Sequence, residues 1–240
     1  MNYIKNTTSP LFLLSTTTSY LSSLLILKNI MNNKSPYSLK IPMIIYNSFQ
    51  ILINIYMIYG LSSLPQLSIN NFNLFGLNTL YNSNLEYFTY IHYLSKYLDY
   101  FDTWFIILRK KERQLSFLHI YHHSTIGIIW GFLLYNSNGN GTASFGCLIN
   151  SFIHLLMYSH YLLTSLGINN PFKKIITKAQ LSQFYLCLIH SILVLLYENI
   201  YPINYAWLQL IYQIQMICLF SNFYSKNYNQ YKYVNYLSNR

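Results

Sequence analysis

The chain alternates between long apolar runs and short polar segments. A run of about 20 mostly apolar residues is long enough to cross a bilayer as an α-helix. We find seven such runs and expect a transmembrane helix in each of them. No soluble domain fits between the runs, so the sequence predicts an all-α membrane protein with a single domain over residues 1–240. The expected helices cover residues 10–30, 41–61, 86–107, 115–135, 143–166, 178–198 and 203–223.

The basic residues predict how these helices are oriented. Lys and Arg are enriched in the cytosolic loops of membrane proteins. All of the 15 Lys and Arg residues except Lys5 and Lys96 fall on one side, in the loops after the first, third and fifth runs and in the tail that contains Lys232 and Arg240. We therefore expect a lumenal N-terminus and a cytosolic C-terminus.

Composition agrees with a membrane protein. The chain is 53% hydrophobic and only 8% charged, whereas about 25% of the residues of a soluble domain are charged. The net charge of +10 comes from short clusters between apolar runs. This distribution favours contact with a lipid bilayer and argues against a nucleic-acid partner.

Three histidines interrupt the fourth run, in the segment His119-Ile-Tyr-His122-His123. An ionisable side chain at bilayer depth usually faces a protein interior or an aqueous cavity and marks a functional site. His119 and His123 are i,i+4 neighbours on one helix face, and His122 lies on nearly the same face. We call this segment the histidine box and predict that it carries the chemistry.

Polar residues recur at helical spacing in three other runs. In the third run Lys96 and Asp99 are i,i+3 neighbours, and we expect them to form an ion pair. Four helices thus direct polar side chains at the cytosolic half of the bundle, which predicts a buried pocket open to the cytosol. The stripes consist of Lys96, Asp99, Asp102 and Thr103; of Asn150, His154, Met157, Tyr158 and Tyr161; and of Thr177, Gln180, Gln183 and Phe184.

One interpretation of the histidine box is metal binding. Membrane di-iron desaturases and hydroxylases use such a box, but they spread their ligands over several boxes, and this chain has 7 histidines and one box. We interpret His92, His160 and His190 as structural, and we expect no bound metal. A transporter-like bundle without enzymatic activity is a further alternative, although it would favour broken helices and repeats.

The other interpretation is acyl transfer. An imidazole can attack a thioester, a second histidine can act as acid or base near neutral pH, and a carboxylate can set an imidazole tautomer. Amides and hydroxyls can hold the thioester oxygen. Arg109, Lys110 and Lys111 in the cytosolic loop can bind the phosphates of a carrier such as CoA. Neither a metal nor a bound cofactor is needed.

Four stretches of the chain resemble motifs of the ELO family of very-long-chain fatty acid elongases and occur in the same order as in that family. The resemblance extends over nearly the whole chain. A lone HxxHH motif would be weak support, but four motifs on the expected helices are specific. Two residues depart from the family pattern: Asp99 stands where the family usually has Glu, and His160 where it usually has an aromatic residue. The stretches are Lys96–Thr103 with Leu108–Lys111, Phe117–Ser124, Asn150–Tyr158 and Thr177–Phe184.

The resemblance implies a 3-ketoacyl-CoA synthase in the endoplasmic reticulum membrane. Such an enzyme condenses malonyl-CoA with a long-chain acyl-CoA and releases CO₂ and CoA. The implied fold has about seven transmembrane helices, six of which ring a narrow acyl tunnel that is open to the cytosol and closed toward the lumen. The reductases and the dehydratase of the elongation cycle, and a second copy of the chain, are candidate partners.

The resemblance also implies roles for individual residues. His122 would attack the acyl-CoA thioester, and His119 and His123 would handle protons and orientation. His154 would polarise the thioester carbonyl, and Asp102 would set an imidazole tautomer. The substrate-binding set would be Lys96, Asp99, Thr103, Arg109, Lys110, Lys111, Asn150, Tyr158, Thr177, Gln180 and Gln183, in which Asn150, Gln180 and Gln183 position CoA or the oxyanion.

Overall fold

The structure is a computed structural model that describes residues 2–62, 75–169 and 171–226. Every regular element in these residues is helical, so the all-α prediction is confirmed. Lys232 and Arg240, which contribute to the predicted basic tail, lie outside the described residues. The α-helices are α1 (Asn2–Thr7), α2 (Pro10–Met31), α3 (Lys40–Ser62), α4 (Ser83–Leu98), α5 (Tyr100–Leu108), α6 (Phe117–Tyr135), α7 (Ser144–Leu166), α8 (Lys173–Tyr197) and α9 (Ile203–Tyr224), and η3 (Glu112–Gln114) and η4 (Gly141–Ala143) are short 3₁₀ helices.

Local sequence signals set several of the helix ends. Ser9 caps the N-terminus of α2, and proline occupies the first turn. Ser116 caps α6, where its hydroxyl oxygen accepts a hydrogen bond from the backbone N–H of His119 at 3.2 Å. An N-cap of this kind satisfies one of the free N–H groups of the first helical turn. The first histidine of the box is therefore held in the first turn of α6.

Two predicted boundaries differ from the structure. The expected helix over 86–107 is divided at Asp99 into α4 and α5. No proline or glycine lies at this break to signal the end of a helix. A hydropathy pattern alone does not show where a helix breaks, so the sequence did not predict it. Helix α8 begins at Lys173, five residues before the predicted start at Lys178, because its first turn is polar and hydropathy detects only the apolar part of a helix.

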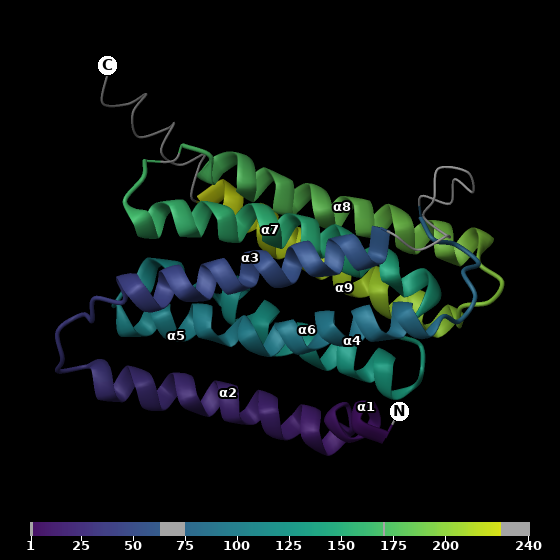
Figure 1. Cartoon of the computed structure of the whole chain (residues 1–240), viewed down its shortest axis with the longest axis horizontal. Helices are drawn as coiled ribbons and strands as arrows, with labels where there is room; N and C mark the ends of the chain where they lie inside the picture. Colours follow the sequence, from purple (N-terminus) through teal and green to yellow (C-terminus); the bar gives the residue numbers. More distant parts are fainter. Residues whose placement is uncertain (1, 63–74, 170, 227–240) are drawn as a thin grey trace.

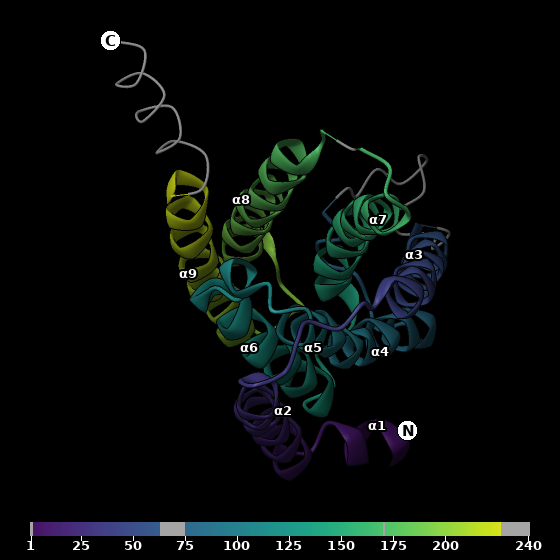
Figure 2. The ribbon, with the colours of Figure 1, turned by 90° about the vertical axis from the view of Figure 1, so that its left-hand side faces the viewer.

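The long helices form a ring with one helix outside it (Figure 2). In the order of their contacts, the ring runs from α3 to α7, α8, α9, α6 and the α4–α5 unit, and α4 packs against α3 to close it. Helix α2 packs on the outside against α5 and α6, and the short α1 contacts α2 and α6. The end-on view in Figure 2 shows this arrangement.

The two ends of the bundle differ in charge. The basic end, at the left of Figure 1, holds the α5–α6 link with Arg109–Arg113 and the first turn of α8 with Lys173 and Lys174. The opposite end holds the start of α4, the α6–α7 link and Glu198 just after α8. We call it the Glu198 end. The site described below lies between the two ends.

Three of the helices, α2, α3 and α8, are long and apolar enough to cross a membrane. Their outward surfaces expose large apolar side chains, among them Leu25, Ile41 and Ile175. Such surfaces are expected where lipid replaces water as the solvent. The other four expected spans stay predictions.

Candidate active site

The histidine box lies in the first turns of α6, and its rings are close together. The rings of His119 and His123 stack with their centroids 4.2 Å apart, which confirms that they share one helix face. The ring of His122 is nearly perpendicular to that of His123, at a centroid distance of 5.7 Å. His122 therefore faces a different neighbour from the stacked pair.

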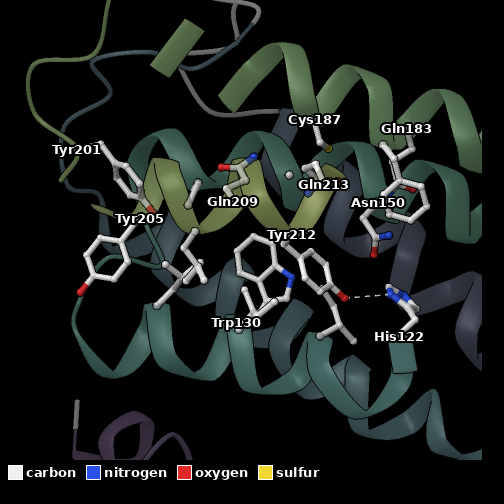
Figure 3. Close-up of a pocket in the computed structure, with 17 residues that line it drawn as sticks. His122, Trp130, Asn150, Gln183, Cys187, Tyr201, Tyr205, Gln209, Tyr212 and Gln213 are labelled. Carbon is white, nitrogen blue, oxygen red and sulfur yellow. Dashed lines mark hydrogen bonds between the residues drawn. The ribbon is translucent and has the colours of Figure 1, made fainter. Parts of the chain in front are cut away.

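His122 lines an apolar cavity between α6, α7, α8 and α9 (Figure 3). The space inside it that admits a water-sized sphere is about 70 Å³, so the cavity is narrow. His122 lies at one end of it, and Tyr201 and Tyr205 lie at the other. The wall between these ends is formed mainly by Ile126, Ile129, Trp130, Leu133, Leu208 and Cys187.

The hydroxyl of Tyr212 on α9 lies 3.3 Å from Nδ1 of His122. The same hydroxyl is 3.2 Å from Oγ1 of Thr125, one turn further along α6. A hydrogen bond to one ring nitrogen of a histidine determines what the other nitrogen can do. Tyr212 is thus a site residue that the sequence reasoning missed. In the sequence it is one tyrosine in an apolar run. Because the chain has 26 tyrosines, that position alone did not single it out.

Two predicted amides also line the cavity. Asn150 on α7 and Gln183 on α8 are among its lining residues (Figure 3). The ammonium group of Lys96 donates a 2.9 Å hydrogen bond to Oδ1 of Asn150. Because the amide oxygen is engaged by Lys96, the orientation of the Asn150 amide group is set.

The expected ion pair of Lys96 and Asp99 is confirmed. Lys96 Nζ lies 3.4 Å from Asp99 Oδ2, and both side chains are buried. Asp99 Oδ1 accepts hydrogen bonds from Gln50 Nε2 at 3.0 Å and from the Tyr158 hydroxyl at 2.9 Å. Nδ1 of His154 lies 4.0 Å from Asp99 Oδ2. Side chains from three helices, α3, α4 and α7, therefore converge on one carboxylate.

The expected role of Asp102 is not supported by its contacts. Its Oδ2 lies 3.1 Å from the hydroxyl of Tyr46 and 2.7 Å from that of Tyr158, whose single proton is shared between Asp102 and Asp99. No imidazole is hydrogen-bonded to Asp102 in the part of the chain that the structure describes. The hydroxyl that reaches the histidine box is instead that of Thr103, 2.9 Å from Nε2 of His119. Adjacent residues of a helix point about 100° apart, so Asp102 faces α3 and α7 while Thr103 faces α6.

The remaining predicted residues lie further from the cavity wall. The hydroxyl of Thr177 donates to the carbonyl of Lys173 in its own helix, and Gln180 contacts the sulfur of Met157 at 3.3 Å. At the basic end, Lys110 donates to the backbone carbonyl of Asn32. Arg109 and Lys111 lie beside it, where α5 ends.

Helix α3 supplies two further residues that sequence reasoning missed. Gln50 donates to the hydroxyl of Tyr46 at 2.9 Å, and both reach the carboxylates of α4 and α5. Their i,i+4 spacing in an apolar run was an available signal, since polar groups in membrane helices tend to face other helices. The tyrosine lies in a stretch, Pro42–Asn47, that resembles the second span of the ELO family.

The single histidines have different surroundings. His190 supports the structural interpretation, because its Nε2 lies 3.0 Å from the carbonyl oxygen of Phe75 and its Nδ1 lies 3.3 Å from Gln209 Nε2. His92 is fully buried against Trp130, and neither of its ring nitrogens has a hydrogen-bond partner in the described residues. Among the described residues, no three His, Cys, Asp or Glu side chains are placed to hold a metal ion.

This arrangement suits a reaction on an apolar substrate. An imidazole stands at one end of an apolar cavity, and two amides and a tyrosine hydroxyl surround it. A hydrocarbon chain could fill the cavity while its reactive end lies at His122. Buried polar groups of this kind stabilise developing charge strongly, because little water competes with them.

Comparisons with known proteins identify the family of the chain. Residues 6–235 match the model of the ELO (GNS1/SUR4) family. The chain is 45% identical to a protein named fatty acid elongase 5 of Leishmania major over 213 residues, which cover 89% of this chain and 84% of that protein. It is 46% identical to fatty acid elongase 5 of Trypanosoma cruzi over 208 residues, covering 87% and 80%.

A more distant relative extends the comparison. Very long chain fatty acid elongase 5 of Homo sapiens is 36% identical over 205 residues, covering 83% of this chain and 68% of the human protein. The stretch of residues 6–235 that matches the family model spans the histidine box, the carboxylates of α4 and α5 and the amides of α7 and α8. The chain therefore belongs to the ELO (GNS1/SUR4) family of multi-pass membrane proteins and is a fatty acid elongase, the condensing enzyme of fatty acid elongation.

Proposed function

We propose that this elongase spans the endoplasmic reticulum membrane seven times, with its basic end in the cytosol and its Glu198 end toward the lumen. The clustering of Lys and Arg at one end supports this orientation. The six-member ring would surround the acyl tunnel, and α2 would lie outside it. The cavity described above would be the part of the tunnel that holds the acyl tail.

The first half-reaction takes place at His122. A ring nitrogen of His122 attacks the thioester carbon of the acyl-CoA, the carbon–sulfur bond breaks, and CoA leaves with a proton. The acyl group is then carried on the imidazole, with its tail in the apolar cavity. The Tyr212 hydroxyl at Nδ1 supports this role, because it can hold one nitrogen while the other reacts.

The second half-reaction consumes malonyl-CoA. Loss of CO₂ leaves a carbanion at the carbon next to its thioester. This carbon attacks the acyl carbon, and the bond from the acyl carbon to His122 breaks. The product is a 3-ketoacyl-CoA that is two carbons longer, and the released imidazole nitrogen takes up a proton from solvent, which restores neutral His122.

The neighbouring polar groups would position the substrates. Asn150 and Gln183 line the cavity beside His122 and can hold the carbonyl oxygen where negative charge develops. His154 lies next to the Lys96–Asp99 pair and would polarise the thioester carbonyl. His123 would move protons beside His122. At the basic end, Arg109, Lys110 and Lys111 would bind the phosphates of CoA.

The observation that supports this proposal most strongly is the place of His122 at the end of the cavity. Its test is a reaction of the purified, detergent-solubilised protein with acyl-CoA alone. The expected result is release of about one CoA per enzyme molecule and a mass increase by the acyl group on the peptide that contains His122. Addition of radiolabelled malonyl-CoA should then give a labelled 3-ketoacyl-CoA.

Two variants make this test specific. His122→Ala should lose both CoA release and product formation, whereas His160→Ala, a change outside the cavity lining, should retain both. CoA release only after malonyl-CoA is added would overturn the two-step order. A panel of acyl-CoA lengths in the same assay gives the chain preference.

The remaining proposals have separate tests. Protease protection of tags at both ends of the chain in microsomes reports the orientation, and a cytosolic N-terminus would contradict it. Co-purification with the reductases and the dehydratase of the elongation cycle tests the protein partners. Light scattering of the detergent complex tests whether the chain forms a dimer.

A further inference from the structure

Helix α2 lies outside the ring, and one of its polar groups connects to the histidine box. The hydroxyl of Tyr20 lies 2.8 Å from Oγ1 of Thr103 on α5. Thr103 in turn is 2.9 Å from Nε2 of His119. Tyr20 is 2% exposed and Thr103 is 0% exposed. A continuous chain of hydrogen bonds thus links the outer helix to the histidine box.

The direction of these hydrogen bonds follows from the donors available. A buried hydroxyl donates its proton to some acceptor, and in the described residues the partner of the Tyr20 hydroxyl is Thr103. Of the possible directions, the one in which Oγ1 of Thr103 accepts from Tyr20 and donates to His119 Nε2 gives both hydroxyl protons an acceptor. Because Nε2 acts as acceptor, the proton of the neutral His119 ring is on Nδ1.

We propose that Tyr20 is a positioning residue of the elongase, which acts through Thr103 to hold His119 in the tautomer with the proton on Nδ1. The His119 ring stacks on His123 at 4.2 Å, and His123 lies beside His122. A fixed His119 ring therefore fixes one side of the histidine box. The effect on turnover rests on the proposed function, whereas the tautomer itself does not.

The same interface provides a matched control. Three residues further along α2, the hydroxyl of Ser23 accepts a 2.9 Å hydrogen bond from the indole N–H of Trp104 on α5. Ser23→Ala and Tyr20→Phe each remove one hydroxyl from α2 that bonds to α5. Only Tyr20 is connected to a histidine, so a purely structural role would give the two variants similar effects.

The first experiment measures kcat and KM for acyl-CoA in five variants. Tyr20→Phe should lower kcat roughly three- to tenfold, the factor that corresponds to the usual net contribution of one hydrogen bond, with little change in KM. Thr103→Val should lower kcat at least as much, and adding Tyr20→Phe to it should cause no further loss. Ser23→Ala should retain the wild-type kcat.

Thr103→Ser keeps the hydroxyl and should restore activity close to that of the wild type. Equal losses of kcat in Ser23→Ala and Tyr20→Phe would overturn the proposal, because they would indicate only the packing of α2. Independent losses in the double variant would overturn it as well, because the two residues would then not act in one chain.

The second experiment observes the tautomer without any turnover. Nitrogen-15 NMR of the histidine-labelled protein, with His119 assigned by His119→Gln, should show an unprotonated Nε2 in the wild type. Tyr20→Phe should raise the fraction with a proton on Nε2. A wild-type signal from a protonated Nε2 would overturn the proposal, even if the two half-reactions at His122 are correct.

Discussion

The histidine-box region and the Glu198 end use buried polar groups in opposite ways. Around the box, buried groups are left without partners: His123 Nδ1 and Gln50 Oε1 have none among the described residues. At the Glu198 end, one carboxylate has all its acceptor sites engaged. We interpret the unpartnered atoms as available to a substrate, and the fully engaged carboxylate as a structural contact.

Glu198 joins three segments that are far apart in the sequence. Its Oε2 accepts from the backbone N–H of Asn78 at 2.7 Å and from the hydroxyl of Thr142. Its Oε1 accepts from the N–H groups of Ile200 and Tyr201, at 2.9 and 3.3 Å. Because Tyr201 lines the far end of the cavity, this cluster also holds one boundary of the substrate site.

The charge of Glu198 follows from the same contacts. Burial by itself would raise the pKa of Glu198, but the hydrogen bonds from Thr142 and the backbone outweigh it and hold the pKa below its ordinary value. Hydrogen bonds to a carboxylate favour its charged form. Glu198 is therefore a stabilising anion at neutral pH.

The largest effect is expected where a single change leaves a buried charge unpaired. Lys96→Met removes the cation beside Asp99, and loss of one partner of a buried ion pair typically costs about 3–5 kcal/mol. We expect a correspondingly lower free energy of unfolding, measured with a chemical denaturant, and loss of activity. The double variant Lys96→Met/Asp99→Asn should regain part of the stability, and a single variant as stable as the wild type would contradict the pairing.

A smaller stability effect is expected at the opposite end. Glu198→Gln keeps the shape of the side chain but removes its charge, and a hydrogen bond to a charged group contributes about 1.5–3 kcal/mol when buried. Because Glu198 is only partly buried, we expect a loss of roughly 1 kcal/mol. Turnover of short acyl-CoA substrates should stay near the wild-type rate, and a complete loss of turnover would remove the contrast between the two regions.

The hydroxyl at His122 should affect chemistry more than stability. Tyr212→Phe removes the partner of His122 Nδ1, and we expect the rate of CoA release from acyl-CoA to fall roughly three- to tenfold. Stopped-flow thiol detection measures this rate. Tyr205→Phe, which removes a hydroxyl further along the cavity, is the control, and an equal loss of rate there would show that the effect is not specific to His122.

The smallest effect is a pH dependence of stability. A carboxylate whose pKa is lowered by folding stabilises the folded state above its unfolded pKa, and this contribution is lost as the pH falls through the folded pKa. The difference in unfolding free energy between wild type and Glu198→Gln should thus stay constant from neutral pH to about pH 5. It should shrink below the ordinary glutamate pKa of about 4.3. If the difference in unfolding free energy instead grew as the pH fell, the pKa of Glu198 would be raised by folding, and the prediction would be wrong.

Much of the fold could be predicted because it depends on properties of short segments. The apolar runs place the helices within a few residues of their observed bounds, and Ser9 and Ser116 cap helices where the chain becomes apolar. The break at Asp99 could not be predicted in this way. It has no proline or glycine, and the side chain of Asp99 bonds to α3 and α7.

The candidate site was predicted in part for the same reason. The stack of His119 on His123 and the pair of Lys96 with Asp99 are i,i+4 and i,i+3 contacts, which helix geometry alone dictates. The partners supplied by other helices were predicted less well. Tyr212 was missed, and Asp102 was assigned a contact with imidazole that Thr103 makes instead.

The sequence by itself determined the helices, the box with its two stacked rings, and the membrane character of the chain. Only the tertiary structure decided which side chains meet His119 and His122. Thr103 meets His119, Tyr20 meets Thr103 and Tyr212 meets His122, over separations of up to 90 residues. The periodicity of a helix relates residues within one or two turns, whereas the face that meets a neighbouring helix depends on how all the helices pack.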